Sequence, residues 1–515
     1  MIESYTYWTL VCMHIAFSMT WMYKLSRTSR YLRHWHQSGD FGTEQPASEM
    51  CVIIPVLEET VRLWHTVERF VKMQDNIQGR YSVIIVTTEK EKEAYQHTTR
   101  NLLHRVDQAG SIAELESVLS VALPKLGNNT QHRLDSNINL EQARQISRTL
   151  IQERPDTIEL ADELAERYPC VRTFHMPGTT GNMAHQVNYG VEQFVQTVSD
   201  SGSVLFALYN ADSCPDQRAF AWVRHIRHQY HRQHCIFQQY GIYFNNFENW
   251  SRDSFIKKSI LTAAAAWQSR WSLGFEIPNA LRTFRDDTDF VMEEKKCFPF
   301  VNYCIGHGLF FDYDTYKKFK GFSTTTHNED AIFGLQASYS GVPIIPVPFF
   351  ESADSPDTVR ALYIQKSTWF WGPFQAFKYK DIIMGYENIN NLANKFRLTW
   401  LSCCLFEHGV RWIAGPTLMV FFLALSLLHP LPYRLPLFIL VYLIYLVLPN
   451  LVAIALSKTY LEEGIQKFRW PGTIAECCTG SILMFIMHGA SAYRTIWIKL
   501  TSAQIQKERT PLKGQ

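Results

Sequence analysis

The chain has 515 residues, enough for one large domain with a membrane part or for two to three ordinary domains. Its formal net charge of +2 is near neutral and no basic tract carries interleaved aromatics, which excludes nucleic acid as a partner. Eleven cysteines are scattered without a CxxC pair, which indicates reduced thiols in a protein that faces the cytosol.

An apolar run opens the chain from Tyr5 to Tyr23 and is followed at once by Lys24 and three arginines. A cleavable signal has the opposite order, with its charges before the apolar core. We therefore predict an uncleaved membrane anchor over residues 1–24. Because positive charge favours the cytoplasmic side, the chain that follows is expected in the cytoplasm.

Short β-branched runs, each bounded by polar or turn residues, recur through the next 350 or so positions and alternate with helical patterns. These runs cover 51–56, 81–86, 171–174, 204–208, 235–237 and 342–345. The alternation predicts an α/β domain over residues 48–375 with a doubly wound, mainly parallel sheet. In such a sheet, ligands bind at the carboxyl ends of the strands.

Residues 94–167 depart from this rhythm, because they are rich in Glu, Arg, Gln and Leu at helical spacing. We predict a helical segment inserted into the α/β domain. A solvated structural role is favoured over a catalytic one, and binding of a partner remains open.

One predicted strand ends in oxygen ligands. The apolar run Val204–Leu208 leads into Tyr209-Asn210-Ala211-Asp212. Alternating oxygen ligands at a strand end suit Mg²⁺ or Mn²⁺, which keep coordination positions for a diphosphate. An isolated aspartate at such a place more often caps a helix or forms a turn.

A second polar segment lies about a hundred residues further on. Gly306 and Gly308 permit close backbone approach to a ligand, and Asn328-Glu329-Asp330 precedes an apolar helical pattern. In a partly dry cleft the pKa of Asp330 would rise, which makes it a candidate general base. Its simpler role would be to complement a helix dipole.

The C-terminal third is predicted to enter the membrane. The aromatic cluster Gln365–Trp371 leads to linker helices expected at the interface over residues 376–410. Membrane helices are predicted within 411–499, followed by a tail at 500–515. Their apolar segments are Trp412–Leu428, Leu435–Leu456 and Ile474–Ile498, with Leu398–His408 as a further candidate pass. The number of passes stays open.

Taken in order, these motifs resemble those of the membrane-bound glycosyltransferases of family 2, which include cellulose, chitin and hyaluronan synthases. The similarity covers roughly Cys51 to Trp371. The matching segments are Ile54–Glu59 ("VPVxNE" type), Gly181–Asn188 ("GKxxALN" type), Asn210–Asp212 ("DxD" type), Asn328–Asp330 ("TED" type) and Gln365–Trp369 ("QxxRW" type).

The resemblance implies a GT-A type mixed sheet, an inverting reaction with a nucleotide-diphosphate sugar, a UDP-sugar first among them, and a divalent metal, Mn²⁺ or Mg²⁺. The acceptor would be a growing polysaccharide or a lipid-linked glycan, among membrane lipids. By position, Asp212 would hold the metal, and Glu329 and Asp330 would be catalytic, with Asp330 taking the acceptor proton. The donor site would include Pro55, Glu58, Asn188, Asn210, Asp212, Gly306 and Gly308, and the acceptor site Gln365, Trp369 and Trp371.

The sequence departs from the family pattern at several charged positions. Asn210 replaces the first acid of the DxD motif, Asn182 replaces a basic residue, and Thr368 replaces the arginine of the QxxRW motif. Glu89 stands where an aspartate usually contacts uracil. These losses keep a second hypothesis open, a membrane scaffold with a decayed glycosyltransferase fold. A nucleotidyltransferase on a similar sheet is a third, but the membrane-proximal aromatics give it no purpose.

Overall fold

The computed structural model describes residues 2–38, 41, 49–60, 62–74, 80–123, 138–229, 234–282, 300–326, 328–387, 389, 391–428, 431–461 and 470–501. The chain divides into two compact units, which we describe separately. The sheet unit comprises Gly42–His234 and Gly306–Glu329, and the helical unit comprises Met1–Phe41, Cys235–Ile305 and Asp330–Pro511. The predicted tail lies outside the described residues from position 502 onward.

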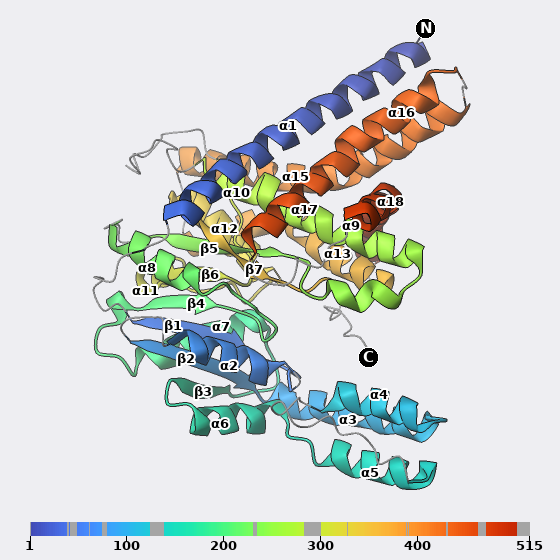
Figure 1. Ribbon diagram of the computed structural model, residues 1–515. Helices are drawn as coiled ribbons and strands as arrows, with labels where there is room; N and C mark the ends of the chain where they lie inside the picture. Colours follow the sequence, from blue (N-terminus) through green and yellow to red (C-terminus); the bar gives the residue numbers. More distant parts are fainter. Residues whose placement is uncertain are drawn as a thin grey trace. The chain divides into compact units, whose positions relative to one another are not determined.

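The sheet unit contains strands in the order β3-β2-β1-β4-β6 (Figure 1). Their bounds are β1 Met50–Pro55, β2 Tyr81–Thr88, β3 Val171–Met176, β4 Leu205–Leu208 and β6 Leu309–Asp312. The first four strands of this order run parallel, and β6 is antiparallel to β4. Strands β1 and β2 are buried along almost their whole length, as parallel strands covered on both faces must be. The predicted mixed α/β sheet is confirmed; β6 was not predicted.

Helices of the sheet unit connect and cover these strands. Their bounds are α2 Leu63–Met73, α6 Thr157–Arg167, α7 Met183–Val195, η3 Ser201–Ser203, α8 Arg218–Gln229 and α11 Tyr313–Lys318. Helix α7 packs on β1, β2 and β3, and α6 packs on β3 and β2. The apolar positions of α2, including Trp64, Val67 and Phe70, are buried, as the spacing of an amphipathic helix predicts.

The predicted helical insertion contains three helices with a core of their own. Helices α3 (Lys90–Gln108), α4 (Ile112–Ala122) and α5 (Leu140–Gln152) bury Leu102, Val106, Leu115, Leu119 and Ile151 against one another. Helix α6, which the prediction assigned to the insertion, packs on the sheet instead. Residues 124–137 of the insertion lie outside the described residues.

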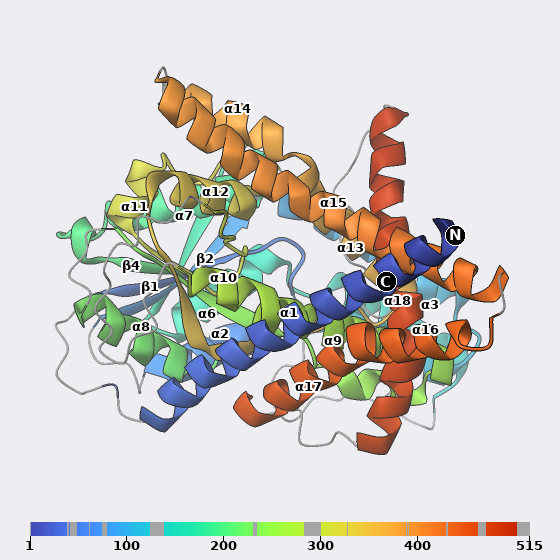
Figure 2. The same cartoon turned by 90° about the horizontal axis from the view of Figure 1, so that it is seen from above.

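The helical unit pairs two parallel strands and carries the remaining helices (Figures 1 and 2). Its elements are α1 Ile2–Ser38, β5 Ile236–Ile242, η4 Phe247–Arg252, α9 Phe255–Trp271, η5 Ser272–Glu276, α10 Ile277–Ala280, α12 Glu329–Ser340, β7 Ile344–Ser352, α13 Val359–Phe374, α14 Ala376–Glu387, α15 Leu392–Leu428, α16 Arg434–Tyr442, η6 Leu443–Val447, α17 Leu448–Tyr460 and α18 Trp470–Leu500. The turns η5 and η6 are π-helical.

Within the described ranges, three helical segments are long and apolar enough to cross a membrane: Leu392–Leu428, Arg434–Tyr460 and Trp470–Leu500. The candidate pass Leu398–His408 is not separate, because α15 runs through it and through the expected boundary at residue 410. With 37 residues at about 1.5 Å each, α15 is about 55 Å long, well beyond a hydrocarbon core of about 30 Å. Helix α1 is not among the three, since His14 and several hydroxyl side chains dilute its apolar run.

Helices α9 and α18 are in close contact, and the carboxylate of Glu476 is buried between them. A Cβ atom on Gly480 would lie 1.9 Å from the carbonyl oxygen of Ser259, so only glycine fits there. Beside this contact, Glu476 of α18 accepts from Lys258 at 2.7 Å and from Thr262 at 2.9 Å. A carboxylate in an apolar helix therefore has a matching cation, as burial of charge requires.

Candidate active site

The polar residues predicted in the sheet unit gather at one edge of the sheet. Because β1, β2 and β4 are parallel and in register, their carboxyl ends meet there. Pro55 ends β1, and Asn210 lies two residues after the end of β4. The antiparallel pairing of Leu208 with Leu309 places Gly308, with a φ of 61°, beside the end of β4.

The loop that carries Asp212 is held by helix α2. A guanidinium nitrogen of Arg62 lies 3.1 Å from a carboxylate oxygen of Asp212. Thr66 donates to the carbonyl of Ala211 at 2.7 Å, and Arg69 donates to the carbonyl of Ser213 at 3.1 Å. The Asp212 side chain is 46% exposed, so its carboxylate is held in place while remaining open to solvent.

Aromatic packing fixes the other side of this loop. Tyr209 is fully buried, with its ring 5.1 Å from that of Phe70, 5.8 Å from that of Phe220 and 5.9 Å from that of Phe310. In the turn that follows, the amide of Asn210 donates to the hydroxyl of Ser213 at 3.1 Å. The sequence thus changes from a buried aromatic at Tyr209 to a largely exposed carboxylate at Asp212 within three residues.

Glu58, after β1, has a strained backbone. Its φ of 56° lies in the left-handed region, which is costly for a residue with a side chain. Its amide donates to Glu91 at 2.7 Å, and its carboxylate accepts from Thr98 at 2.6 Å. Burial raises the pKa of Glu91, although hydrogen bonds from Thr157 and the Glu58 amide oppose this effect. The Glu58 carboxylate is therefore directed at α3.

A basic residue follows β2. The side chain of Lys90 donates to the carbonyl of Gly181, and Glu89 accepts from the amide of Gly178 at 3.0 Å. Gly181 has a φ of 120°, which only glycine adopts readily. Lys90 thus brings an ammonium group to the segment in which Asn182 replaces the expected basic residue.

Asn182 and Asn188 brace the loop before α12. Asn182 caps α7 and donates to the carbonyls of Thr324 and Thr326 at 3.3 and 2.8 Å. Asn188 exchanges two hydrogen bonds of 2.8 Å with the backbone of Phe322. The side-chain amide of Asn188 thus donates through its nitrogen and accepts through its oxygen, which indicates that Asn188 positions this loop.

Glu329 and Asp330 begin helix α12, where the chain passes from the sheet unit to the helical unit. Glu329 is 5% exposed, and Asp330 is half-buried and accepts from the amide of Ala331 at 2.8 Å. The first turns of α12 lie against the segment at Cys304, because a Cβ on Gly334 would come within 2.5 Å of the Cys304 nitrogen. Burial, and then the charge of Asp330, raise the pKa of the Cys304 thiol.

Helix α13 carries the predicted acceptor residues. Gln365 and Trp369 are four residues apart and half-buried, as is Trp371. The side-chain oxygen of Gln365 is buried and has no hydrogen-bond partner among the described residues. Lys366, the basic residue nearest the missing arginine, is instead 2% exposed and donates to Gln268 at 3.0 Å, with its ammonium 4.2 Å from the centre of the Trp369 ring.

The residues at the sheet edge fit a divalent metal only in part. Within the described ranges, no group of three or more His, Cys, Asp or Glu side chains is placed to hold an ion. Asp212 and Asn210 offer one carboxylate and one amide. They suit an ion such as Mg²⁺, which keeps several waters and takes further oxygens from substrate phosphates.

Two basic residues at this edge were missed from the sequence. Arg62 lies 150 positions from Asp212, so no local pattern signals their contact. Lys90 offered a clear signal, since it lies four residues after the predicted strand at 81–86. Both bring positive charge where several motif charges are absent.

Comparison with known proteins finds a family match for one part of the chain. Residues 261–458 match the model of glycosyl transferase family group 2. The matched segment contains Asp330 and the whole of α13, and it ends within α17. No curated protein matches the chain. Among solved structures, the mannosyltransferase PcManGT from Pyrobaculum calidifontis, in complex with GDP-Man and Mn²⁺, is similar at 11% identity and a TM-score of 0.42, over 95% of this chain and 99% of that one.

Proposed function

We propose that the protein is a membrane-embedded glycosyltransferase that moves a sugar from a nucleotide-diphosphate donor to a polysaccharide or lipid-linked acceptor. The family match over residues 261–458, which contains Asp330 and the Gln365–Trp369 motif, carries the proposal. The polar edge of the sheet unit supports it, since parallel sheets bind nucleotides at the carboxyl ends of their strands. The three membrane-length helices support an acceptor at the bilayer.

In the proposed reaction an acceptor hydroxyl oxygen attacks the anomeric carbon while the bond from that carbon to the diphosphate oxygen breaks. Asp330 takes the hydroxyl proton, and the nucleoside diphosphate leaves with the bonding electron pair. A single displacement of this kind inverts the anomeric carbon. Asp330 and Asp212 must then face one cleft, which remains a prediction.

The negative charge that develops on the leaving diphosphate must be neutralised. Asp212, with Asn210 beside it, would hold a Mn²⁺ or Mg²⁺ ion, which supplies Lewis-acid stabilisation of the leaving oxygens. Arg62 and Lys90 are positive groups of this chain at the same edge and would add to that stabilisation. The donor is expected to be a UDP-sugar, and the catalytic domain is expected in the cytoplasm because basic residues follow the apolar run of α1.

The test is transfer of radiolabelled sugar from a panel of nucleotide sugars by the purified full chain, with and without lipid. We expect Asp330→Asn to lower the rate by about 10²–10⁴, the usual contribution of a general base. Asp381→Asn is the matched control, since this aspartate of α14 is 72% exposed. Transfer at the native rate by the Asp330→Asn protein would refute the proposed role.

The scaffold alternative is favoured by the pairing of Asp212 with Arg62, because a carboxylate with a protein cation has less need of a metal. Calorimetry with UDP- and GDP-sugars plus Mn²⁺ separates the two functions. Heat of binding that Asp212→Asn removes supports the enzyme. No binding at any metal concentration supports the scaffold.

A further inference from the structure

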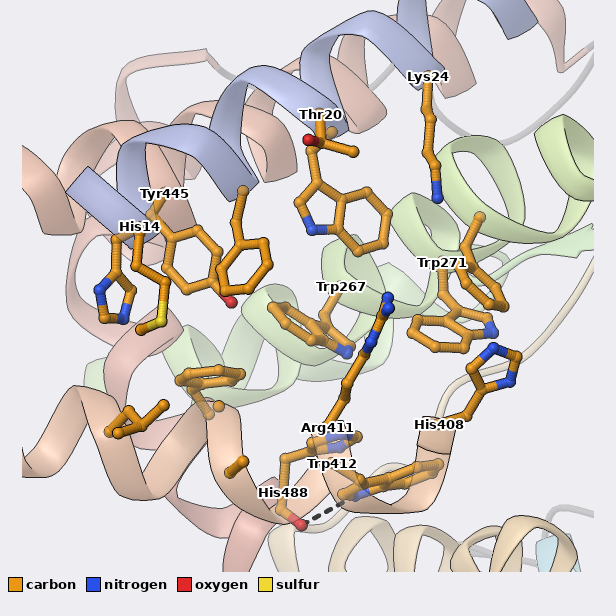
Figure 3. A pocket seen from close by; sticks show the side chains of 18 residues that line it. His14, Thr20, Lys24, Trp267, Trp271, His408, Arg411, Trp412, Tyr445 and His488 are labelled. Atoms are coloured by element: carbon orange, nitrogen blue, oxygen red, sulfur yellow. Dashed lines mark hydrogen bonds between the residues drawn. The ribbon is translucent and has the colours of Figure 1, made fainter. Parts of the chain in front are cut away.

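The helical unit contains a cavity of about 210 Å³ between α1, α9, α15 and α18 (Figure 3). A neighbouring cavity of about 400 Å³ shares Lys24, Phe275, His408 and Arg411 with it. Because these four side chains line both cavities, we describe the two cavities together as the basic-aromatic recess. The proposed sugar-transfer chemistry uses none of the residues that line it.

Among the described residues that line this recess, cations outnumber carboxylates. Lys24, Arg282 and Arg411 line it, and Glu407 is the one carboxylate among these described residues. Glu407 is already paired with Arg411, one turn along α15. In Figure 3 the side chains of Lys24 and Arg411 extend into the same space from opposite helices.

Unlike Arg411, Lys24 has no carboxylate partner among the described residues. Its ammonium lies 5.0 Å from the centre of the Phe275 ring and forms no hydrogen bond or ion pair with the described residues. Burial, and then the charges of Arg282 and Arg411, lower its pKa to about 8, while Glu407 opposes this effect. An anion between Lys24 and Arg411 would relieve both the repulsion and the missing contact.

The other end of the recess is apolar and aromatic. Trp267, Trp271 and Trp412 line it together with Phe17 and Phe485. The lining residues Phe275 and Tyr445 lie in the π-helical turns η5 and η6, which are rare and occur frequently at functional sites. Helices α15 and α18, which supply Arg411 and Phe485, are long and apolar enough to cross a bilayer.

We propose that the basic-aromatic recess binds a phosphate-bearing lipid, with its phosphate between Lys24 and Arg411 and its hydrocarbon chain along Trp267, Phe17 and Phe485. Charge complementarity selects the anionic head, and the apolar lining selects the chain. The phosphate would supply Lys24 with the anionic partner that it lacks among the described residues. The site requires only binding, so it does not depend on glycosyl transfer by the chain.

The probe is phosphatidic acid with brominated acyl chains, added to the purified full chain in detergent. Bromine quenches nearby tryptophans, so saturable quenching reports occupancy of the Trp267 end of the recess. We expect Lys24→Gln and Arg411→Gln each to raise the half-saturating concentration at least tenfold. Lys24→Arg should bind as the native chain does. Arg30→Gln is the matched control, because Arg30 is exposed on the same helix and lines neither cavity.

Competition separates the possible ligands. Unbrominated phosphatidic acid should reverse the quenching, whereas inorganic phosphate or a neutral diacylglycerol should compete at least tenfold more weakly. Equal competition by either would overturn recognition of a lipid phosphate. Stronger protection by a soluble oligosaccharide would show a glycan site instead. Unchanged melting temperatures confirm that the variants are folded, and native binding by folded Lys24→Gln and Arg411→Gln proteins would also overturn the proposal.

Discussion

Replacing Lys366 by methionine should change how the stability of the protein depends on pH. Lys366 is 2% exposed, and burial lowers its pKa from the ordinary 10.5 to about 7, an effect that Glu276 partly opposes. The unfolded chain therefore binds more protons than the folded protein between pH 7 and 10.5. Stability must rise with pH across that window, and the full cost of the charge is present below pH 7.

The magnitude follows from the two pKa values. At about 1.4 kcal/mol for each pKa unit, the charged side chain costs the folded protein about 5 kcal/mol below pH 7. Raising the pH from 6 to 9 should increase the free energy of unfolding of the native protein by about 3 kcal/mol. Lys366→Met removes the charge but also the hydrogen bond to Gln268, at a cost of about 1–3 kcal/mol at every pH. The variant should therefore be more stable than the native protein at pH 6 and nearly equal to it at pH 9.

The assay is the apparent melting temperature in detergent, followed by tryptophan fluorescence at pH 6, 7.5 and 9. Lys378→Met on α14 is the control, because this lysine is exposed. Its profile should run parallel to that of the native protein. His488 of α18 also lies within electrostatic reach of Lys366, so His488→Gln measures any shared contribution. Parallel profiles for the native and Lys366→Met proteins would refute the reasoning.

Three further substitutions test contacts that the structure shows. Arg62→Gln should raise the affinity for Mn²⁺ by roughly two- to fivefold, the effect of one exposed ion pair, as measured by electron paramagnetic resonance of free Mn²⁺; an unchanged affinity would count against metal binding by Asp212. Asn188→Ala should lower the free energy of unfolding by about 1–3 kcal/mol, because the Phe322 backbone loses both partners, and chemical denaturation would detect it. Gly480→Ala should lower the melting temperature markedly through a clash between α18 and α9 that costs at least about 1–3 kcal/mol, and a native melting temperature would contradict that packing.

Local patterns predicted most of the secondary structure. Runs of β-branched residues identified six of the seven strands within the described residues, because a buried strand must be apolar along its own length. β6 was missed because its four residues follow a glycine-rich segment, and its pairing with β4 joins positions about a hundred residues apart. The segment 398–408, which the sequence left open as a further pass, and the predicted segment 412–428 belong to one helix, because hydropathy marks apolar stretches but not whether the backbone continues between them.

Residue types and strand ends were thus available from the sequence, including the placement of Asn210 and Asp212 at the edge of a sheet. The tertiary structure alone decided which residues far apart in the chain come together. It paired Asp212 with Arg62, buried Lys366 beside Gln268, and brought Lys24 and Arg411 into one recess. The physical reason is that hydrophobic periodicity acts over a few residues, whereas charge pairing and burial depend on distances in space between residues far apart in the chain.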